Sequence, residues 1–380
     1  MHTNDTVSPE SQTIPEAAAA GREAGFRRGH EEGYRIGMLQ GGLAALEPPL
    51  LPVKAVHVLY VTAGIGVPYP ALDAAVIEAL RSRAAKVTVA SPSDDVAQTA
   101  AKHRPDLVLV LNGVVFPAEQ VEQLRKLGIR TAVWFTDDPY YTDWTSAIGP
   151  RYDYIFTLEQ SCVAFYESLG CRQVYYLPFA ATPALFHPRQ VAQQYQSDIC
   201  FIGTGFWNRI DLIDRLAPYL QNRKVVIAGW WWDRLKHYNQ LSDSIRLGDW
   251  MTPEETASYY NGAKIVINLH RSVDDDTINA NRIKLPAASP NPRTFEISAC
   301  GTLQLADVRA DLGNWYKADE EIALFSTYEE LIAKLEHYLT HEEERRKIAL
   351  RGLLRTRRHH TYDWRLHTLL EHVFPGGVTI

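Results

Sequence analysis

The chain has few cysteines and no long apolar segment. Only four of its 380 residues are cysteine (Cys162, Cys171, Cys200 and Cys300), and no two of them form a C-x-x-C pair. Such spacing indicates buried thiols in a reducing compartment and argues against a disulfide framework or a zinc site. No uncharged apolar run approaches the roughly 18 residues that a membrane span needs. Residues 1–13 lack the basic start and the apolar core of a signal peptide. We therefore expect a cytoplasmic protein without a membrane span.

Two phosphate-binding signatures are also missing. The chain contains neither the Walker loop, G-x-x-x-x-G-K-[ST], nor the dinucleotide-binding motif G-x-G-x-x-G. A net formal charge of -6 does not favour nucleic acid, so no nucleic-acid partner is expected. With 46% hydrophobic residues, the chain is long enough for two domains that each have their own core.

Residues 1–50 are expected to form an N-terminal arm. The first 20 residues are polar and then alanine-rich, which indicates disorder. Glycine then recurs at every fourth position, at Gly21, Gly25, Gly29, Gly33, Gly37 and Gly41. Each glycine costs a helix about 1 kcal/mol relative to alanine, so an isolated helix is not expected. Two interpretations stay open: a helix packed on a partner, giving an oligomer or a docking element through residues 21–42, and a flexible arm.

From residue 53 onward, apolar strands alternate with helical patterns. Strands are expected in a first domain, 51–185, at 55–62, 86–90, 106–111, 131–135, 154–158 and 173–178, with helices such as 71–83 and 117–127 between them. A second domain, 186–355, follows a proline-rich linker and has expected strands at 198–203, 224–228, 244–247, 264–269 and 302–306. Its expected helices are 208–220, 253–261, 293–300 and 327–351, and a last helix lies within 356–380. The pattern predicts two α/β domains whose parallel sheets face one cleft.

The strongest local signal is the segment N-P-R-T-F-E-I-S-A-C-G-T at 291–302. A helix is expected to begin after Pro292, which puts Arg293, Thr294 and free backbone N–H groups at one place suited to phosphate. Glu296, one turn further on, can accept two hydrogen bonds from hydroxyls, as from a ribose. The alternative is that Arg293 and Glu296 form an i,i+3 pair on the surface.

Two further segments follow strands of the second domain. Gly203, Thr204, Gly205 and Arg209 lie in a glycine loop that permits close approach to a phosphate, although an ordinary strand-to-helix turn is the alternative. Trp230 and Trp231 follow another strand and can stack on a base or a sugar, with Trp250 as a second candidate. Packing at the domain interface is the alternative for the tryptophans, and at least one of them is expected in the core.

The R-x-F-E-x-x-A-C-G pattern resembles the donor-binding helix of the CgeB-type glycosyltransferases, a spore maturation family. This resemblance implies a GT-B fold with two Rossmann-like domains, and it implies that Glu296 holds the ribose of a nucleotide. D-I-C-F-I-G-T-G-F-W-N-R resembles the opening of the C-terminal domain of that family, which brings Gly203, Thr204, Gly205 and Arg209 to the diphosphate. K-I-V-I-N-L-H-R resembles the strand before the donor loop and ends in Asn268, His270 and Arg271. W-F-T-D-D-P-Y-Y resembles a segment of the N-terminal domain.

The acceptor side is expected on loops of the first domain. Gly64 and Gly66 follow one strand, and Asp137, Asp138 and Tyr140 follow another. Transfer to a hydroxyl with inversion needs a general base, and a carboxylate suits that role, so Asp137 and Asp138 are the catalytic candidates. A turn capped by carboxylates is the alternative, and a retaining enzyme needs no such base.

No metal site or cofactor is expected. The D-x-D within Asp274, Asp275 and Asp276 lies in a polar stretch away from a strand end, which favours a solvated loop. In GT-B enzymes, helix N-termini and basic side chains stabilise the departing diphosphate.

We predict a metal-independent glycosyltransferase that moves a sugar from a nucleoside diphosphate sugar to a hydroxyl acceptor. A UDP-sugar is favoured, and the family resemblance implies an acceptor on a cell- or spore-surface protein or polysaccharide. The alternatives are a GT-B-shaped sugar-nucleotide epimerase or hydrolase and a non-catalytic two-domain sugar-binding protein.

Overall fold

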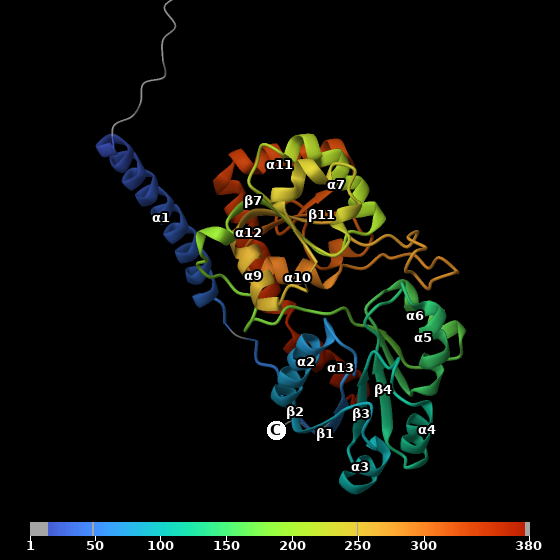
Figure 1. The fold of residues 1–380 in the computed structure, drawn as a ribbon. Helices are drawn as coiled ribbons and strands as arrows, with labels where there is room; N and C mark the ends of the chain where they lie inside the picture. The colour runs from blue at the N-terminus through green and yellow to red at the C-terminus, as the bar shows by residue number, and fades with distance from the viewer. Residues whose placement is uncertain (1–13, 48, 249, 377–380) are drawn as a thin grey trace, which may run out of the picture.

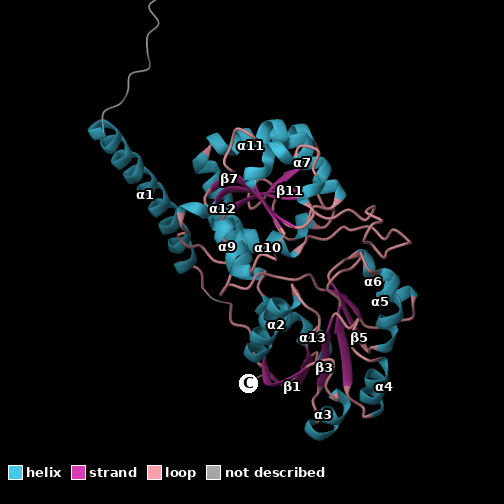
Figure 2. Cartoon of the chain, in the orientation of Figure 1, coloured by secondary structure: helices cyan, strands magenta, loops and turns pink. Residues whose placement is uncertain are grey.

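A computed structural model describes residues 14–47, 49–248 and 250–376. Two α/β halves lie one above the other, and a long N-terminal helix, α1 (Ile14–Ala44), extends away from them (Figure 1). Helices flank the strands of both halves (Figure 2).

The first half is built on a parallel six-stranded sheet of order β2-β1-β3-β4-β5-β6. Its strands are β1 (Lys54–Val61), β2 (Ala84–Ala90), β3 (Leu107–Leu111), β4 (Arg130–Trp134), β5 (Tyr154–Thr157) and β6 (Val174–Tyr176). Its helices are α2 (Tyr69–Arg83), α3 (Val96–His103), α4 (Ala118–Lys126), α5 (Thr142–Ile148) and α6 (Ser161–Ser168). All five residues of β3 are buried, as expected of a central strand that is covered on both faces.

The second half repeats this architecture with the strand order β12-β11-β10-β7-β8-β9. Its strands are β7 (Ser197–Ile202), β8 (Val225–Gly229), β9 (Ile245–Leu247), β10 (Ala263–Asn268), β11 (Leu303–Asp307) and β12 (Ala323–Phe325). Its helices are α7 (Trp207–Leu220), α8 (Tyr238–Leu241), α9 (Pro253–Gly262), α10 (Pro292–Ala299), α11 (Tyr328–Thr340) and α12 (Glu342–His359). The short 3₁₀ helices of the chain are Gly149–Arg151, Gln193–Tyr195, Trp232–Arg234, Ser242–Ser244 and Leu312–Asn314.

The last helix, α13 (Tyr362–Val373), returns to the first half. It lies beside α2 (Figure 1), and its buried side chains, among them Leu366 and Leu370, join the first core. Nε of Arg365 also donates to the carbonyl oxygen of Pro178 at 2.7 Å, which connects α13 to the segment that follows β6.

The prediction of a single helix at 327–351 is wrong, because the helix is interrupted at His341, between α11 and α12. The helix expected from residue 356 is really two, with α12 ending at His359 and α13 starting at Tyr362.

The N-terminal arm is helical from Ile14, so the disorder expected for residues 14–20 is wrong, and residues 1–13 lie outside the described residues. The C-terminal part of α1 packs on α12. Leu39 is 1% exposed and lies against Gly301, and Gly42 lies against Leu350. A Cβ atom added at any of the six fourth-position glycines would meet no described atom within 4 Å. These glycines therefore do not mediate the packing on α12, and docking or oligomerisation through residues 21–42 stays a prediction.

The loops at the carboxyl ends of β7 and β8 meet so closely that a side chain does not fit between them. Gly229 has a φ of 133°, and a Cβ atom there would lie 2.3 Å from the carbonyl oxygen of Gly203. We expect Gly229→Ala to lower the free energy of unfolding by about 1–3 kcal/mol, measured by urea denaturation. Gly313→Ala is the matched control, because nothing lies within 4 Å of its added Cβ. Equal losses in both variants would contradict the close approach.

Candidate functional site

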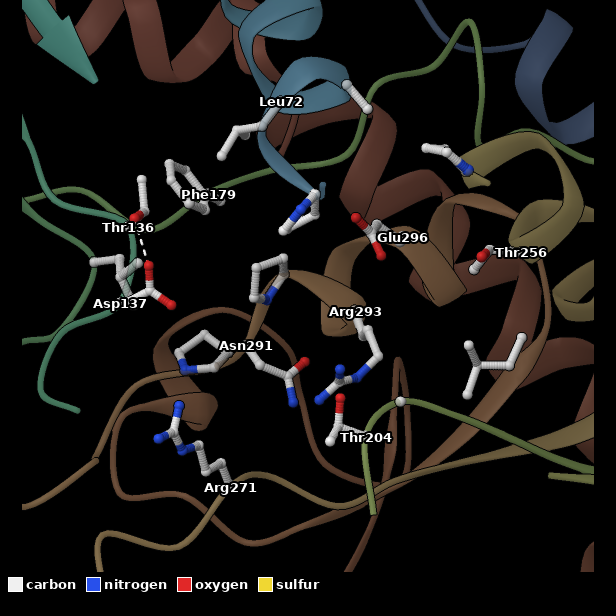
Figure 3. A pocket seen from close by; sticks show the side chains of 18 of the residues that line it. Leu72, Thr136, Asp137, Phe179, Thr204, Thr256, Arg271, Asn291, Arg293 and Glu296 are labelled. Carbon is white, nitrogen blue, oxygen red and sulfur yellow. Dashed lines mark hydrogen bonds between the residues drawn. The ribbon is translucent and has the colours of Figure 1, made fainter. Parts of the chain in front are cut away.

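A cavity of about 460 Å³ lies between the two halves, where the carboxyl ends of both sheets face each other. The first half contributes Asp137, Asp138 and Tyr140 to its lining. The second half contributes Gly203, Thr204, Arg209, Trp230, His270, Arg271, Arg293 and Glu296, several of which Figure 3 labels. The structure therefore brings most of the predicted site residues to one cavity.

Six predicted residues do not line the cavity. Gly64 and Gly66 lie in the exposed start of the loop after β1, and that loop reaches the cavity only from Pro68 onward. Gly205 lies behind the loop, against the backbone of Trp231. The Trp231 ring packs against Phe206 with a centroid distance of 5.9 Å. Asn268 and Thr294 are buried beneath the start of α10.

A buried amide network fixes the start of α10. Oδ1 of Asn291, the N-cap residue, accepts from the backbone N–H of Thr294 at 3.1 Å. Asn268 pairs with Asn291 and donates to Oγ1 of Thr294 at 3.1 Å. Gln304 donates to the carbonyl oxygen of Thr294 at 2.6 Å. Neither Asn291 nor Gln304 was expected at the site, although an asparagine before Pro-Arg is a recognisable N-cap signal.

His270 positions the same helix start. Its Nδ1 lies 2.5 Å from Oδ1 of Asp307, and its Nε2 accepts the backbone N–H of Asn291 at 3.0 Å. Because Nε2 accepts, the ring carries its proton on Nδ1 and is neutral, and burial lowers its pKa. The histidine orients Asn291 and has no nitrogen left for a ligand.

Two arginines converge beside Gly203. Arg209 is 1% exposed and is held by the carbonyl oxygens of Leu269, at 3.0 Å, and of Thr204, at 2.9 Å. A Cβ atom at Gly203 would lie 3.1 Å from Nη1 of Arg209 and 3.2 Å from Nη1 of Arg293. Among the residues that the structure describes, no carboxylate lies within 4.0 Å of either guanidinium. Burial, and then the charge of Arg293, lowers the pKa of Arg209. The site is therefore ready to bind an anion.

Glu296 lines the cavity one turn into α10 and forms no ion pair with Arg293 within 4.0 Å, so the surface-pair interpretation is wrong. In the described part of the chain, no group hydrogen-bonds to its carboxylate. Burial raises the pKa of Glu296 to about 7, although the charge of Arg293 lowers it in part. Its oxygens are free to accept from hydroxyls of a ligand.

The neighbouring Asp137 and Asp138 point in different directions. Asp138 is 1% exposed, and its carboxylate accepts from Thr157 at 2.7 Å and from Tyr166 at 2.9 Å inside the first core. Burial raises the pKa of Asp138 to about 7. Oδ2 of Asp137 accepts from Tyr69 at 2.7 Å and from Thr136 at 2.6 Å. Its other oxygen has no partner among the described groups, and the side chain lies at the cavity wall (Figure 3).

The tryptophans divide between cavity and core. Trp230 and Trp250 are 39% and 41% exposed, line the cavity, and have ring centroids 5.8 Å apart. Trp232 is fully buried and donates from Nε1 to the carbonyl oxygen of Gly203 at 2.9 Å. One tryptophan is thus in the core, as expected.

The long connection at residues 269–291 links the two halves. Glu159 of the first half is buried, and its carboxylate accepts the backbone N–H groups of Ala288 and Ser289 at 3.1 Å. The backbone N–H of Gln160 donates to the Ser289 hydroxyl at 2.9 Å. The start of α10 follows directly, so a carboxylate of the first half helps to place it. Nothing in the sequence marked Glu159 as part of the site.

Within the described ranges, no three His, Cys, Asp or Glu side chains are clustered so that they could hold a metal ion. Asp275 is buried and accepts from Thr277 and from the backbone N–H of Trp207, so it links its own loop to the start of α7. No helix in these ranges has the length and the apolar character to cross a bilayer.

The two facing parallel sheets and the cavity between them define a GT-B protein. Sucrose-phosphate synthase from Thermosynechococcus elongatus shares this fold with a TM-score of 0.57 at 14% sequence identity, over 83% of this chain and 96% of that one. HepE from Anabaena, in complex with UDP and glucose, is similar with a TM-score of 0.55 at 10% identity, over 83% and 98% of the two chains.

Sequence comparison then gives the family. A family model described as Glycosyl transferase-like matches residues 209–371. Spore protein CgeB of Bacillus subtilis (strain 168) is 30% identical over 308 residues, which are 80% of this chain and 95% of that protein. The chain belongs to the CgeB family and is a glycosyltransferase. The expected family and GT-B fold are confirmed.

The raised pKa of Glu296 makes stability depend on pH. The folded state holds this proton more tightly than the unfolded chain, whose carboxyl has a pKa of 4.5, so ionisation costs stability as pH rises from about 4.5 to about 7. Glu296→Gln removes that cost. We expect the melting temperature of this variant to exceed that of the wild type at pH 8, with the gap shrinking toward pH 5. Glu122→Gln, at an exposed position, should show no such pH dependence. A gap that is equal at both pH values would contradict the assignment.

Proposed function

We propose that the chain transfers a sugar from a UDP-sugar to a hydroxyl acceptor on a cell- or spore-surface protein or polysaccharide, in the cytoplasm and without a metal ion. The observation that carries this proposal is the pair of arginines beside Gly203, which have no carboxylate partner and border a cavity between two α/β domains. The UDP complex of HepE, which has the same fold, supports uridine as the base.

The donor diphosphate binds at Gly203 and Thr204, between Arg209, Arg293 and the start of α10. The backbone N–H of Arg293, which has no partner among the described residues, and the positive end of the helix dipole favour a phosphate. Pro292 has no N–H, and that of Thr294 is donated to Asn291. Two arginine charges match the two charges of a diphosphate diester, so no metal ion is required. Asn268, His270 and Thr294 act indirectly, because they and Asn291 hold the start of α10.

The nucleoside lies further along the same wall. Glu296 accepts hydrogen bonds from the two ribose hydroxyls, since its carboxylate faces the cavity. Trp230 and Trp250 form the wall beside the base, because both rings are partly exposed and line the cavity. Trp231 packs on Phe206 instead and is not assigned to the base.

Asp137 is the general base. The acceptor hydroxyl gives its proton to the free oxygen of Asp137 while its own oxygen bonds to the anomeric carbon of the sugar. The bond from that carbon to the phosphate oxygen breaks at the same time, and UDP leaves with the electron pair. Attack opposite to the leaving group inverts the anomeric centre. Asp138 positions Asp137, because its own carboxylate is fixed in the core by hydrogen bonds from Thr157 and Tyr166.

Nucleotide binding can be measured by thermal stabilisation in the presence of EDTA. UDP at 100 times its Kd should add about 2.7 kcal/mol of stability, which raises the melting temperature by several degrees. Arg293→Ala and Glu296→Ala should abolish most of this shift, because they remove a phosphate contact and the ribose acceptor. Arg282→Ala is the control, since that side chain is 89% exposed.

The proposal fails at different points under different outcomes. No shift with UDP, ADP, GDP, CMP or dTDP would overturn the donor site. A shift with another base alone would overturn only the choice of uridine. A shift that requires Mg²⁺ would overturn metal independence.

The role of Asp137 can be separated from donor binding. Asp137→Asn should lower kcat by about 10²- to 10⁴-fold, because a general base is lost, while the Kd for UDP stays unchanged. UDP release with an extract of surface glycans and proteins measures turnover. Asp274→Asn, at an exposed carboxylate, should keep full activity. Retention of the anomeric configuration in the product, seen by NMR, would rule out this role.

A further inference from the structure

Arg271 presents a third guanidinium to the cavity, with a different environment from the other two. It follows His270 at the end of β10, and its guanidinium carbon lies 4.4 Å from the ring centroid of Tyr140 and 4.8 Å from that of Phe206. Its Nε and Nη2 atoms are buried and have no hydrogen-bond partner in the described chain. Across residues 14–47, 49–248 and 250–376, no carboxylate lies within 4.0 Å of its nitrogens.

An arginine in this state has N–H groups to offer a ligand. The guanidinium stays charged in proteins and has five N–H donors in a planar fork. Buried donors without an acceptor are rare in folded proteins because they lose their bonds to water. The rings of Tyr140 and Phe206 hold the guanidinium in place but accept none of its N–H groups as an oxygen would. An anion with two oxygens in one plane fits the fork.

Arg271 does not share the contact with Gly203, although its guanidinium carbon and that of Arg209 both lie 4.8 Å from the ring centroid of Phe206. The three atoms nearest to a Cβ at Gly203 belong to Arg209 and Arg293, and not to Arg271. In the view of Figure 3, Asn291 is drawn between Arg271 and Arg293, and Arg271 and Asp137 are on the same side of the picture. The transferred sugar has to lie between the diphosphate and the general base. Arg271 therefore borders the sugar.

The charges of the site point the same way. Arg209 and Arg293 already match the two charges of the diphosphate, which leaves the charge of Arg271 for another anion. Asp137, the carboxylate with a free oxygen at the cavity wall, is not paired with it. Arg271 stands on the donor half, one residue from His270, so its ligand belongs to the donor.

We propose that Arg271 binds a carboxylate on the transferred sugar, so that the donor is a nucleoside diphosphate hexuronate. The inference rests on the proposed function, since it needs the diphosphate at Gly203. It deepens that function by naming the class of sugar.

The test compares three ligands by isothermal titration calorimetry on the full-length protein: UDP, UDP-glucose and UDP-glucuronate. The wild type should bind UDP-glucuronate roughly 10- to 100-fold more tightly than UDP-glucose, as a hydrogen bond between charged groups does. In Arg271→Gln that ratio should fall to about one while the Kd for UDP stays unchanged. Arg282→Gln, an exposed arginine of the same connection, is the matched control and should keep the preference.

Three results would overturn the inference. Equal affinity of the wild type for UDP-glucose and UDP-glucuronate excludes a carboxylate site. A loss of UDP affinity in Arg271→Gln as large as the loss for UDP-glucuronate would mean that Arg271 binds the diphosphate, and the proposed function would then stand without this refinement. Failure of all three ligands to bind the wild type would reject the proposed function itself.

A second variant covers the case in which Arg271→Gln does not fold. Arg271→Lys keeps the charge but loses the planar fork. It should bind UDP as the wild type does and keep only part of the preference for UDP-glucuronate. An undiminished preference in Arg271→Lys would contradict two-oxygen recognition.

Discussion

The structure depends on positive charge that the protein does not neutralise itself. Arg209 and Arg293 lie beside Gly203, and the carbonyl oxygens that hold Arg209 carry only partial charge. Two like charges at one place repel each other, so neighbouring residues have to hold the two arginine side chains in position. A Cβ atom at Gly203 would lie 3.1 Å from Nη1 of Arg209 and 3.2 Å from Nη1 of Arg293, and the φ of 150° is one that side-chain-bearing residues rarely adopt, so glycine suits this position. Trp232 holds the carbonyl oxygen of the same residue, and the amides beneath α10 keep Arg293 at the start of its helix.

Most of the sheet architecture could be predicted from the sequence. Of the twelve strands in the described part of the chain, eleven were expected near their true positions, because buried parallel strands form continuous apolar runs. The missed strand, β12, has three residues and no recognisable period. The break between α11 and α12 was missed because it falls at His341, with no glycine or proline beside it to signal the end of a helix.

The candidate site was predictable where it follows from strand ends, and less so where it depends on side-chain direction. Topology alone brings Gly203 and Arg271 to one edge of the second sheet and places Asp137 at the corresponding edge of the first. The sequence does not tell which of two adjacent aspartates points into the core of the first half. Asp138 does so because three hydroxyl groups there donate hydrogen bonds to its carboxylate. Gly64 and Gly66 were misplaced because the loop after β1 turns along the surface before it reaches the cavity.

Glu159 makes the connection at 269–291 part of both halves. By chain order this connection belongs to the second half, yet the first half holds the N–H groups of Ala288 and Ser289 just before α10 begins. If the halves rotate apart, there are two possibilities. Either these hydrogen bonds break and leave the buried carboxylate of Glu159 without them, or the connection moves together with the first half. In the second case the start of α10 shifts with it. The start of α10 and the opening of the cleft are then coupled in a single movement, and a molecule bound only to the first half can alter the geometry of Arg293 on the second.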